Sequence, residues 1–145
     1  MGTKVSSVLK HKGHEVVTVT PDQTVARVVR LLAQNRIGAL PVINPDGRLI
    51  GIISERDIIR GMAEHADAVF ALPAERLMTR EVRTCSSEDQ LVDLMEVMTL
   101  QRFRHLPVIE NGALHGIVSI GDVVKQRLEE VQTEAEQLRN YIRSP

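Results

Sequence analysis

The chain contains the same short pattern twice. "GIISERD" at residues 51–57 and "GIVSIGD" at residues 116–122 each consist of Gly, two aliphatic residues, Ser, two variable positions and Asp. Aligning residues 16–59 with 82–124, with one residue deleted in a turn, gives about thirteen identities where about three are expected by chance. A period of about 65 residues is too long for an ordinary solenoid and too short for two full-sized domains. The chain is therefore predicted to fold as two similar halves packed about a pseudo-twofold axis.

Within each half the hydrophobic periodicity changes in the same order. Residues 15–20 are rich in β-branched side chains and predict a strand, and apolar residues at helical spacing from Val25 predict a helix. Residues 39–43 and 48–54 flank a group of turn residues and predict a hairpin, after which a second short helix follows Ser54. The second half repeats this order. The predicted fold class is therefore α/β (α+β), with two β-α-β-β-α repeats.

Composition and charge exclude several classes of function. The chain has 145 residues, 18 of them basic and 19 acidic, so its net charge of −1 creates no overall field toward nucleic acid or a membrane. Aromatic residues make up 2%, which argues against a base-stacking surface, and no segment approaches the ~20 apolar residues of a membrane span. The single Cys85 cannot form an internal disulfide. We expect a cytoplasmic protein with neither nucleic acid nor membrane as a partner.

The repeated unit resembles a known family. "ALPVINPDGRLIGIISERDIIR" and "RHLPVIENGALHGIVSIGDVVK" closely resemble the CBS domain, and the tandem pair resembles a Bateman module over residues 5–127. The resemblance implies a first repeat over 5–63, a linker with the start of the second repeat over 64–81, and a second repeat over 82–127. A C-terminal helix over 128–145 is expected to follow.

This resemblance implies a sensor rather than an enzyme. Proteins of the family typically bind adenosine-containing ligands, such as AMP, ADP, ATP, NADH or S-adenosylmethionine, in the clefts between the two repeats. The sequence has no nucleophile elbow, P-loop or dinucleotide fingerprint, which also argues against catalysis. We expect an energy-sensing regulatory module that binds an adenosine nucleotide, has no catalytic cofactor and acts on an unidentified regulated protein. A redox sensor that prefers NADH over AMP, an S-adenosylmethionine-binding module, a purely structural dimerisation module and a nucleotide-hydrolysing enzyme stay open as alternatives.

The repeated motif permits two interpretations. Ser54 stands where a helix N-cap is expected and Asp57 follows three residues later, which is typical of a capping box. The same geometry can bind a ligand, because helix N–H groups attract anions and a carboxylate accepts both hydrogen bonds of a ribose diol. Gly51, without a side chain, would let the ligand approach the backbone. The family resemblance places Asp57 and Asp122 on ribose hydroxyls, and Ser54 and Ser119 near the phosphate.

The two copies differ in their basic residues. The first carries Arg56 beside the predicted helix start, where the second has Gly121. The second instead has Arg102, Arg104 and His105 before its "LPVI" strand. Either set of arginines could contact a phosphate across the cleft, whereas the alternative for Arg102, Arg104 and His105 is a solvated strand entrance.

The adenine contacts are the least specific assignment. The resemblance implies that apolar side chains and backbone groups of two strands hold the base, and all of them could equally belong to the core: Val17, Thr18, Ile37, Gly38 and Ala39, with Arg83, Thr84 and Phe103 as counterparts. His11 and His14 could form a metal pair, but no cysteine or carboxylate set completes a ligand shell. We expect these histidines to lie in a loop beside the first site, with no metal.

The end of the chain carries an apolar seam outside the repeats. Alternating spacings of four and three residues, as in the a and d positions of a coiled coil, separate Val124, Leu128, Val131, Ala135, Leu138 and Ile142. The helix could fold back on its own repeats. We expect instead a homodimer, in which the tail helices pack on each other or on the repeats of the partner.

Overall fold

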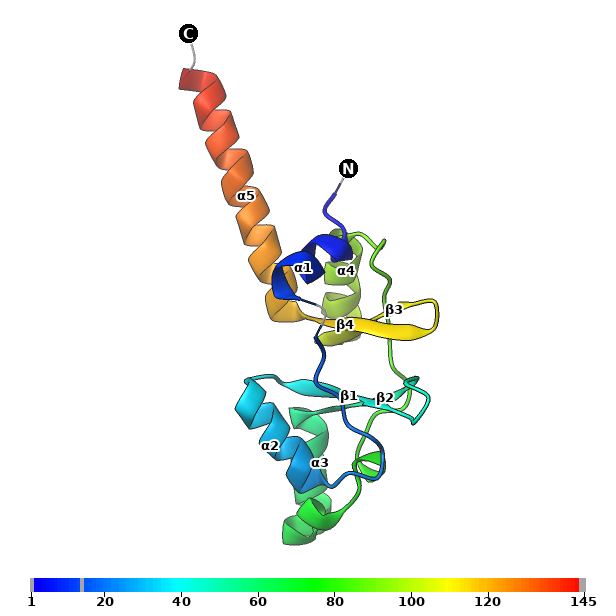
Figure 1. Cartoon of the computed structure of the whole chain (residues 1–145). Coiled ribbons are helices and arrows are strands. Elements are labelled where there is room, and N and C mark those ends of the chain that lie inside the picture. Colours follow the sequence, from blue (N-terminus) through cyan, green and yellow to red (C-terminus); the bar gives the residue numbers. More distant parts are fainter. Residues whose placement is uncertain (1, 14, 144–145) are drawn as a thin grey trace.

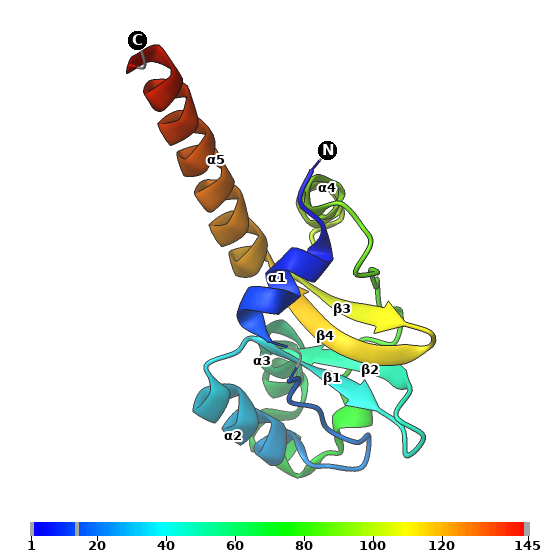
Figure 2. The ribbon, with the colours of Figure 1, turned by 45° about the horizontal axis from the view of Figure 1, so that its top comes forward.

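The protein folds into two stacked halves, each built on a β-hairpin. The structure, a computed structural model, describes residues 2–13 and 15–143. The first hairpin pairs β1 (Ala39–Ile43) with β2 (Leu49–Ser54), and the second pairs β3 (His105–Glu110) with β4 (Ala113–Ser119). In Figures 1 and 2 the two hairpins face each other in the middle of the molecule, and the helices lie on the outer sides. The predicted fold class of two similar α/β repeats is confirmed.

Helices cover the outer side of each hairpin. The first half carries α2 (Val25–Asn35), α3 (Glu55–His65) and the 3-10 helices η1 (Ala66–Ala71) and η2 (Ala74–Arg76). The second half carries α1 (Val5–Lys12), α4 (Leu91–Gln101) and α5 (Ile120–Arg143). Because α1 comes first in the chain but lies in the second half, the order of packing differs from the order of the sequence.

The duplication is visible in the pairing of the strands. Ala39 pairs with Ser54 in the first hairpin, and His105 pairs with Ser119 at the equivalent place in the second. Each hairpin also shifts register after the fourth residue of its first strand. The two repeats therefore share their backbone geometry down to this irregularity.

The strand predicted at the start of each half is reduced to a single bridge, so its predicted length is wrong. The N–H of Val19 donates to the carbonyl of Pro41 (3.2 Å), and the carbonyl of Val19 accepts from the N–H of Ile43 (2.9 Å). Continuing this parallel ladder toward residue 17 would need an N–H on residue 41, which proline lacks. In the second half, Pro107 limits the bridge at Cys85 in the same way.

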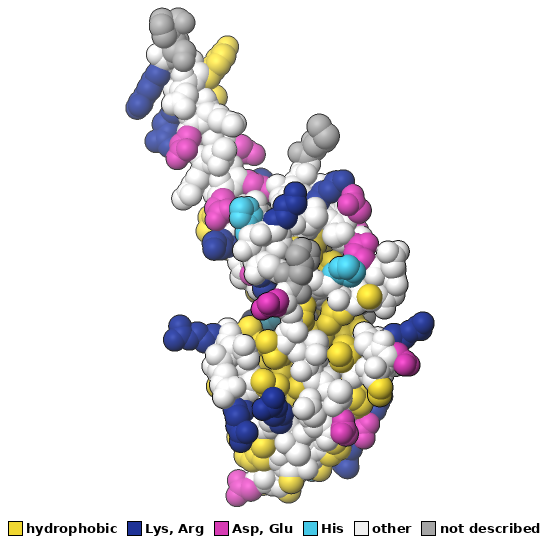
Figure 3. Space-filling model, in the orientation of Figure 1, with side chains coloured by type: hydrophobic (Ala, Val, Ile, Leu, Met, Phe, Trp, Pro, Cys, Tyr) yellow, Lys and Arg dark blue, Asp and Glu magenta, His cyan; other side chains and the backbone are white. Residues whose placement is uncertain are grey.

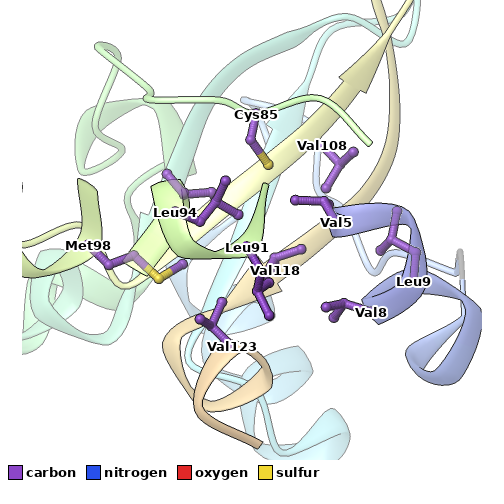
Figure 4. Packing of buried hydrophobic residues seen from close by; sticks show 11 residues of the cluster. Val5, Val8, Leu9, Cys85, Leu91, Leu94, Met98, Val108, Val118 and Val123 are labelled. Atoms are coloured by element: carbon purple, nitrogen blue, oxygen red, sulfur yellow. The ribbon is translucent and has the colours of Figure 1, made fainter. Parts of the chain in front are cut away.

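Each hydrophobic core is completed by the segment that precedes the other repeat. From α1, the side chains of Val5, Val8 and Leu9 pack in the core of the second half, as Figure 4 shows. The residues before the second repeat behave likewise, because Val69, Ala74 and Met78 pack in the core of the first half. The boundaries expected from the sequence assign each segment to the repeat beside it in the chain, not to the core in which it packs. As domain boundaries they stay a prediction.

The glycine of the repeated motif makes room for this packing. A Cβ on Gly51 would lie 2.6 Å from the sulfur of Met78, and a Cβ on Gly116 would lie 2.7 Å from a methyl carbon of Leu9. Such distances are far below van der Waals contact. The expectation that Gly51 lets a ligand approach the backbone is therefore wrong, because the space beside it is filled by the side chain of Met78.

The C-terminal helix projects away from the two halves. The last helix of the second repeat and the tail form one continuous helix, α5, which extends outward in Figures 1 and 2. Its apolar residues are not covered, since Val124, Leu128 and Leu138 are 45%, 58% and 60% exposed. The alternative in which the tail folds back on its own repeats is wrong. Across the described parts of the chain, no helix combines the length and apolar character needed to cross a membrane.

Candidate functional site

A cavity of about 370 Å³ lies between the two halves, beside the start of α3. We call it the first site. Eight residues predicted to bind a ligand line it, namely Gly38, Ala39, Ser54, Arg56, Asp57, Arg102, Arg104 and His105. The lining also includes Arg83 and Phe103, together with six residues that the sequence did not single out, Ile52, Glu55, Arg60, Thr79, Glu81 and Val82. The cavity thus combines the first copy of the motif with the strand entrance of the second half.

The motif forms a capping box, as one of its two interpretations predicted. Asp57 accepts from the backbone N–H of Ser54 (2.8 Å), and the hydroxyl of Ser54 accepts from the backbone N–H of Asp57 (3.4 Å). The second copy has the same pair of bonds between Ser119 and Asp122, at 2.9 and 3.1 Å. Capping accounts for the spacing of Ser and Asp, and in the first copy it leaves Oδ1 of Asp57 for other donors.

Asp57 is the buried acceptor at the centre of the first site. Its side chain is 6% exposed, and its Oδ1 accepts from the hydroxyl of Thr79 (3.1 Å) and from Arg60 (3.4 Å). Two backbone bonds between Thr79 and Ile52, at 2.8 and 3.0 Å, hold Thr79 in place beside β2. The Arg60 contact is long and its side chain is 72% exposed, so a ligand hydroxyl can replace it at little cost.

Positive charge predominates around the cavity. Five arginines line it, against three acidic residues, Glu55, Asp57 and Glu81; the arginines are Arg56, Arg60, Arg83, Arg102 and Arg104. Guanidinium groups bind phosphate through paired hydrogen bonds. On the face shown in Figure 3, by contrast, basic and acidic side chains are interspersed over both halves. The cavity is therefore suited to a small anionic ligand, whereas this face of the molecule carries no single basic patch.

Arg102 has a backbone conformation that favours glycine. It follows α4 with φ of 60°, and Arg36 follows α2 with φ of 54°, both in the left-handed region. Glycine is the usual residue at such a helix end, and another residue costs roughly 1 kcal/mol. Of these two arginines, Arg102 lines the first site and Arg36 does not.

His105 lies where the two halves meet. A Cβ on Gly38, in the other half, would lie 3.3 Å from a ring carbon of His105. Burial lowers the pKa of His105 below its usual value, and the positive charge of Lys12 adds to this effect, while Asp122 and Glu55 oppose it. The imidazole is therefore neutral at pH 7, when it can both donate and accept a hydrogen bond.

The second copy of the motif has its own cationic partner. We call Ser119, Gly121 and Asp122 the second site; none of these three residues lines the first cavity. The ammonium of Lys12 lies 2.6 Å from Oδ2 of Asp122 and donates to the carbonyl of Ile117 (2.8 Å). Burial alone would raise the pKa of Asp122, but the hydrogen bonds from Lys12 and Ser119 together hold it below its usual value. Lys12 thus forms an ion pair with the carboxylate that the family resemblance assigned to a ribose, on the oxygen that also accepts from the N–H of Ser119.

The predicted adenine-binding residues are only partly brought together. Val17 and Ile37 pack against the core of the first half, and Thr84 lines a separate groove between the two hairpins. Thr18 is half-buried and is likewise outside the lining of the first site. Arg60, one helical turn after Asp57, could have been found from helix periodicity. Thr79 and Lys12 gave no signal, because they lie outside the aligned repeats.

The histidine pair suggested as a metal site lies partly outside the described residues. His14 lies outside the described residues, so the distance between it and His11 is not defined. In residues 2–13 and 15–143, no group of three or more His, Cys, Asp or Glu side chains is placed to hold a metal ion.

Two pseudo-symmetric halves, paired capping boxes and a cavity between the halves define a tandem CBS pair. The sequence comparison agrees, because the model of the CBS domain matches residues 5–64 and 74–129. The chain therefore belongs to the CBS domain family.

Solved and curated relatives share the whole pair. A crystal structure of a CBS-domain protein from Agrobacterium tumefaciens is 43% identical, has a TM-score of 0.83 and is matched over 86% of this chain and 99% of its own. The CBS domain-containing protein CBSX3, mitochondrial, of Arabidopsis thaliana is 35% identical over 97% of this chain and 72% of its own length. A crystal structure of CBSX2 in complex with AMP, 24% identical with a TM-score of 0.74, covers 88% of this chain and 98% of its own. At that identity the likeness concerns the fold.

Proposed function

We propose that this chain is a regulatory module that binds an adenosine nucleotide, AMP, ADP, ATP or NADH, in the first site. The observation that carries the proposal is the meeting of a buried carboxylate, Asp57, with five arginines in one cavity of about 370 Å³. A carboxylate suits a ribose diol and guanidinium groups suit phosphate, so the ribose and the phosphate of a nucleotide each have complementary groups in the cavity. The cavity is also within the usual size range of small-molecule sites. CBSX2, which shares the fold, is in complex with AMP in its crystal structure.

In the proposed complex the ribose lies on Asp57. The diol takes the place of Arg60 on Oδ1, and Thr79 stays as the second donor to that oxygen. The released guanidinium of Arg60 is then available to the phosphate. This exchange replaces a long, exposed contact with charge-assisted hydrogen bonds, which are the stronger kind.

In the same complex, arginine side chains bind the phosphate more than the α3 helix start does. Two of the first N–H groups of α3 already have partners, because Glu55 donates to the carbonyl of Gly38 (3.0 Å) and Asp57 donates to Ser54. The N–H of Arg56 lies between them and can face a phosphate. We therefore assign most of the phosphate affinity to the side chains of Arg56 and Arg102.

The charge of the cavity separates this proposal from its two alternatives. S-adenosylmethionine carries a sulfonium cation and no phosphate, so the surrounding guanidinium groups disfavour it. A purely structural module would gather these arginines around a cavity without an anion to balance them. The proposal further comprises a homodimer, a cytoplasmic location and one regulated protein partner, without nucleic acid or membrane. It includes no catalytic step.

Calorimetric titration of the purified chain with AMP and with adenosine tests the phosphate contact. Replacing Arg56→Ala should weaken AMP by about tenfold and leave adenosine nearly unchanged, because only AMP carries the phosphate. The matched control is Arg48→Ala, an arginine in the turn before β2 and outside the first site. Equal losses of affinity for AMP and adenosine would show that Arg56 does not bind the phosphate. The absence of heat with AMP, ADP, ATP and NADH would favour the structural alternative.

A further inference from the structure

One face of α5 is apolar and points away from the rest of the chain. We call Val124, Leu128, Val131, Ala135, Leu138 and Ile142 the α5 stripe. On the other side of the helix, Val123 is buried in the core, and Gln126, Glu130 and Thr133 line a pocket with residues 2 and 3. The stripe is continuous with an outward groove at the helix start, lined by Ile120, Val124 and Leu128. The protein therefore holds the polar side of α5 against itself and presents the apolar side to a partner.

The partner must be elongated and apolar along one face. The stripe repeats with alternating spacings of three and four residues, so it forms a narrow seam and not a broad patch. From Val124 to Ile142 the helix is about 27 Å long. A second helix with the same repeat fits such a seam through knobs-into-holes packing. A second copy of α5 supplies that helix, and the small Ala135 allows close approach at the middle of the seam.

The charges beside the seam decide the relative direction of two such helices. With the stripe in positions a and d, Glu134 lies at position g, and Lys125 and Arg139 lie at position e. In a parallel pair, position g faces the following position e of the other helix, so Glu134 faces Arg139 twice by symmetry. In an antiparallel pair centred near residue 133, Lys125 faces Arg139 and Glu134 faces Glu134. The parallel pair gains two attractions, whereas the antiparallel pair brings like charges together.

We propose that the α5 stripe is a parallel homodimerisation surface, on which two copies of this chain pair their α5 helices side by side. The CBS pairs of the two chains then lie at the same end of the helix pair. This surface is separate from the first site, so the dimer does not depend on nucleotide binding. The antiparallel arrangement is excluded because it brings like charges opposite each other. Burial of the stripe within one chain is excluded because the stripe points outward.

Single cysteines test the direction of the helices in the full chain. Cys85 is buried, and burial raises the pKa of its thiol to about 12, so an added surface cysteine is the reactive one. Leu128→Cys, Ala135→Cys and Ile142→Cys should each form a disulfide-linked dimer with itself under mild oxidation, because equal a positions meet in a parallel pair. Glu136→Cys, on the outer face, should not. An antiparallel pair would give the opposite result, with a mixture of Leu128→Cys and Leu138→Cys linking while neither variant links to itself.

Sedimentation tests whether the stripe holds the dimer. The double change Leu128→Lys/Leu138→Lys should weaken the dimer at least tenfold, whereas Gln137→Lys/Asn140→Lys adds the same charge away from the stripe and should leave it unchanged. Glu134→Arg should weaken it several-fold, and adding Arg139→Glu should restore it. A monomeric natural chain, or a dimer equally strong in both double variants, would overturn the proposal. Pairing of the stripe with a different protein instead of a second copy would also overturn it.

Discussion

The two copies of the capping box have the same backbone geometry and different neighbours. Asp57 accepts from the neutral hydroxyl of Thr79 and lies in an open cavity, whereas Asp122 forms an ion pair with Lys12. The difference comes from the segment that precedes the other repeat. Helix α1 has eight residues where its counterpart η2 has three, and the added residues bring Lys12 to Asp122. A short extension outside the motif thus decides whether a duplicated site is open to a ligand.

This comparison predicts one nucleotide per chain. The ammonium of Lys12, 2.6 Å from Oδ2 of Asp122, forms an ion pair with which a ribose diol would have to compete, and displacing it would leave a partly buried charge pair separated. The first site has no such obstacle, because its exposed Arg60 contact is easily released. We therefore expect nucleotide binding at the first site and none at the second.

The largest expected effect comes from the two aspartates. Asp57→Asn should weaken AMP by about 1.5–3 kcal/mol, because an amide accepts the ribose diol less well than a carboxylate does. Asp122→Asn should leave the affinity nearly unchanged, since Lys12 already forms an ion pair with that carboxylate. Calorimetry on both variants measures this difference, and adenine without a ribose serves as the control ligand. Equal losses in the two variants, or a loss of stability alone, would show that the two sites do not differ as proposed.

Removing the lysine should open the second site. In Lys12→Ala the carboxylate of Asp122 becomes available, so the number of AMP molecules bound per chain should rise from one to two. The second affinity should be the weaker, because Gly121 stands where the first site has Arg56. Lys10→Ala, on the same helix and exposed, is the control and should still bind one. A stoichiometry of one in both variants would mean that Lys12 is not what closes the second site.

Smaller effects on stability and on AMP affinity, opposite in sign, are expected at the C-terminal ends of α2 and α4. Arg36→Gly and Arg102→Gly should each raise the free energy of unfolding by up to about 1 kcal/mol, because glycine tolerates the left-handed backbone. Only Arg102→Gly should weaken AMP, since only Arg102 lines the first site. Thermal unfolding and calorimetry on the same two proteins separate the effects. A loss of AMP affinity in Arg36→Gly as well would implicate the backbone rather than the side chain.

The smallest effect concerns pH and the histidine between the sites. The folded protein lowers the pKa of His105 below the value near 6.5 of an unfolded chain, so the unfolded state binds more protons as the pH falls through about 6.5. The free energy of unfolding should therefore decrease below that pH. In His105→Gln the decrease should be smaller, as denaturant titrations at several pH values would show. An identical pH dependence in both proteins would contradict a buried, neutral His105.

The features that could be predicted from the sequence are those encoded locally. The hairpins follow from turn residues such as Asn111 and Gly112, and the capping boxes follow from the spacing of Ser and Asp. The short bridge at Val19 was also encoded, because Pro41 lacks the N–H that a longer strand would need, yet β-branched composition alone suggested a strand. Local patterns thus define the elements, and misjudge their length where a single missing donor decides it.

The features that the sequence did not predict depend on contacts between distant segments. Lys12 reaches Asp122 across 110 residues, and Thr79 reaches Asp57 across 22. Gly51 was assigned to ligand approach because nothing in the motif indicates that Met78 fills the space beside it. Such contacts arise only when these segments pack onto hairpins distant from them in the sequence, so they require the three-dimensional structure.

The placement of α1 has a consequence for the origin of the chain. Because Val5, Val8 and Leu9 complete the second core while Met78 completes the first, neither sequence repeat, 5–63 or 82–127, contains its whole core. An ancestor with a single repeat would have needed to dimerise with exchange of these segments, so that each molecule completed the core of the other. Joining two such repeats in one polypeptide would make that exchange internal. The present chain should accordingly fold and unfold as one cooperative unit, in which neither repeat survives the loss of the other.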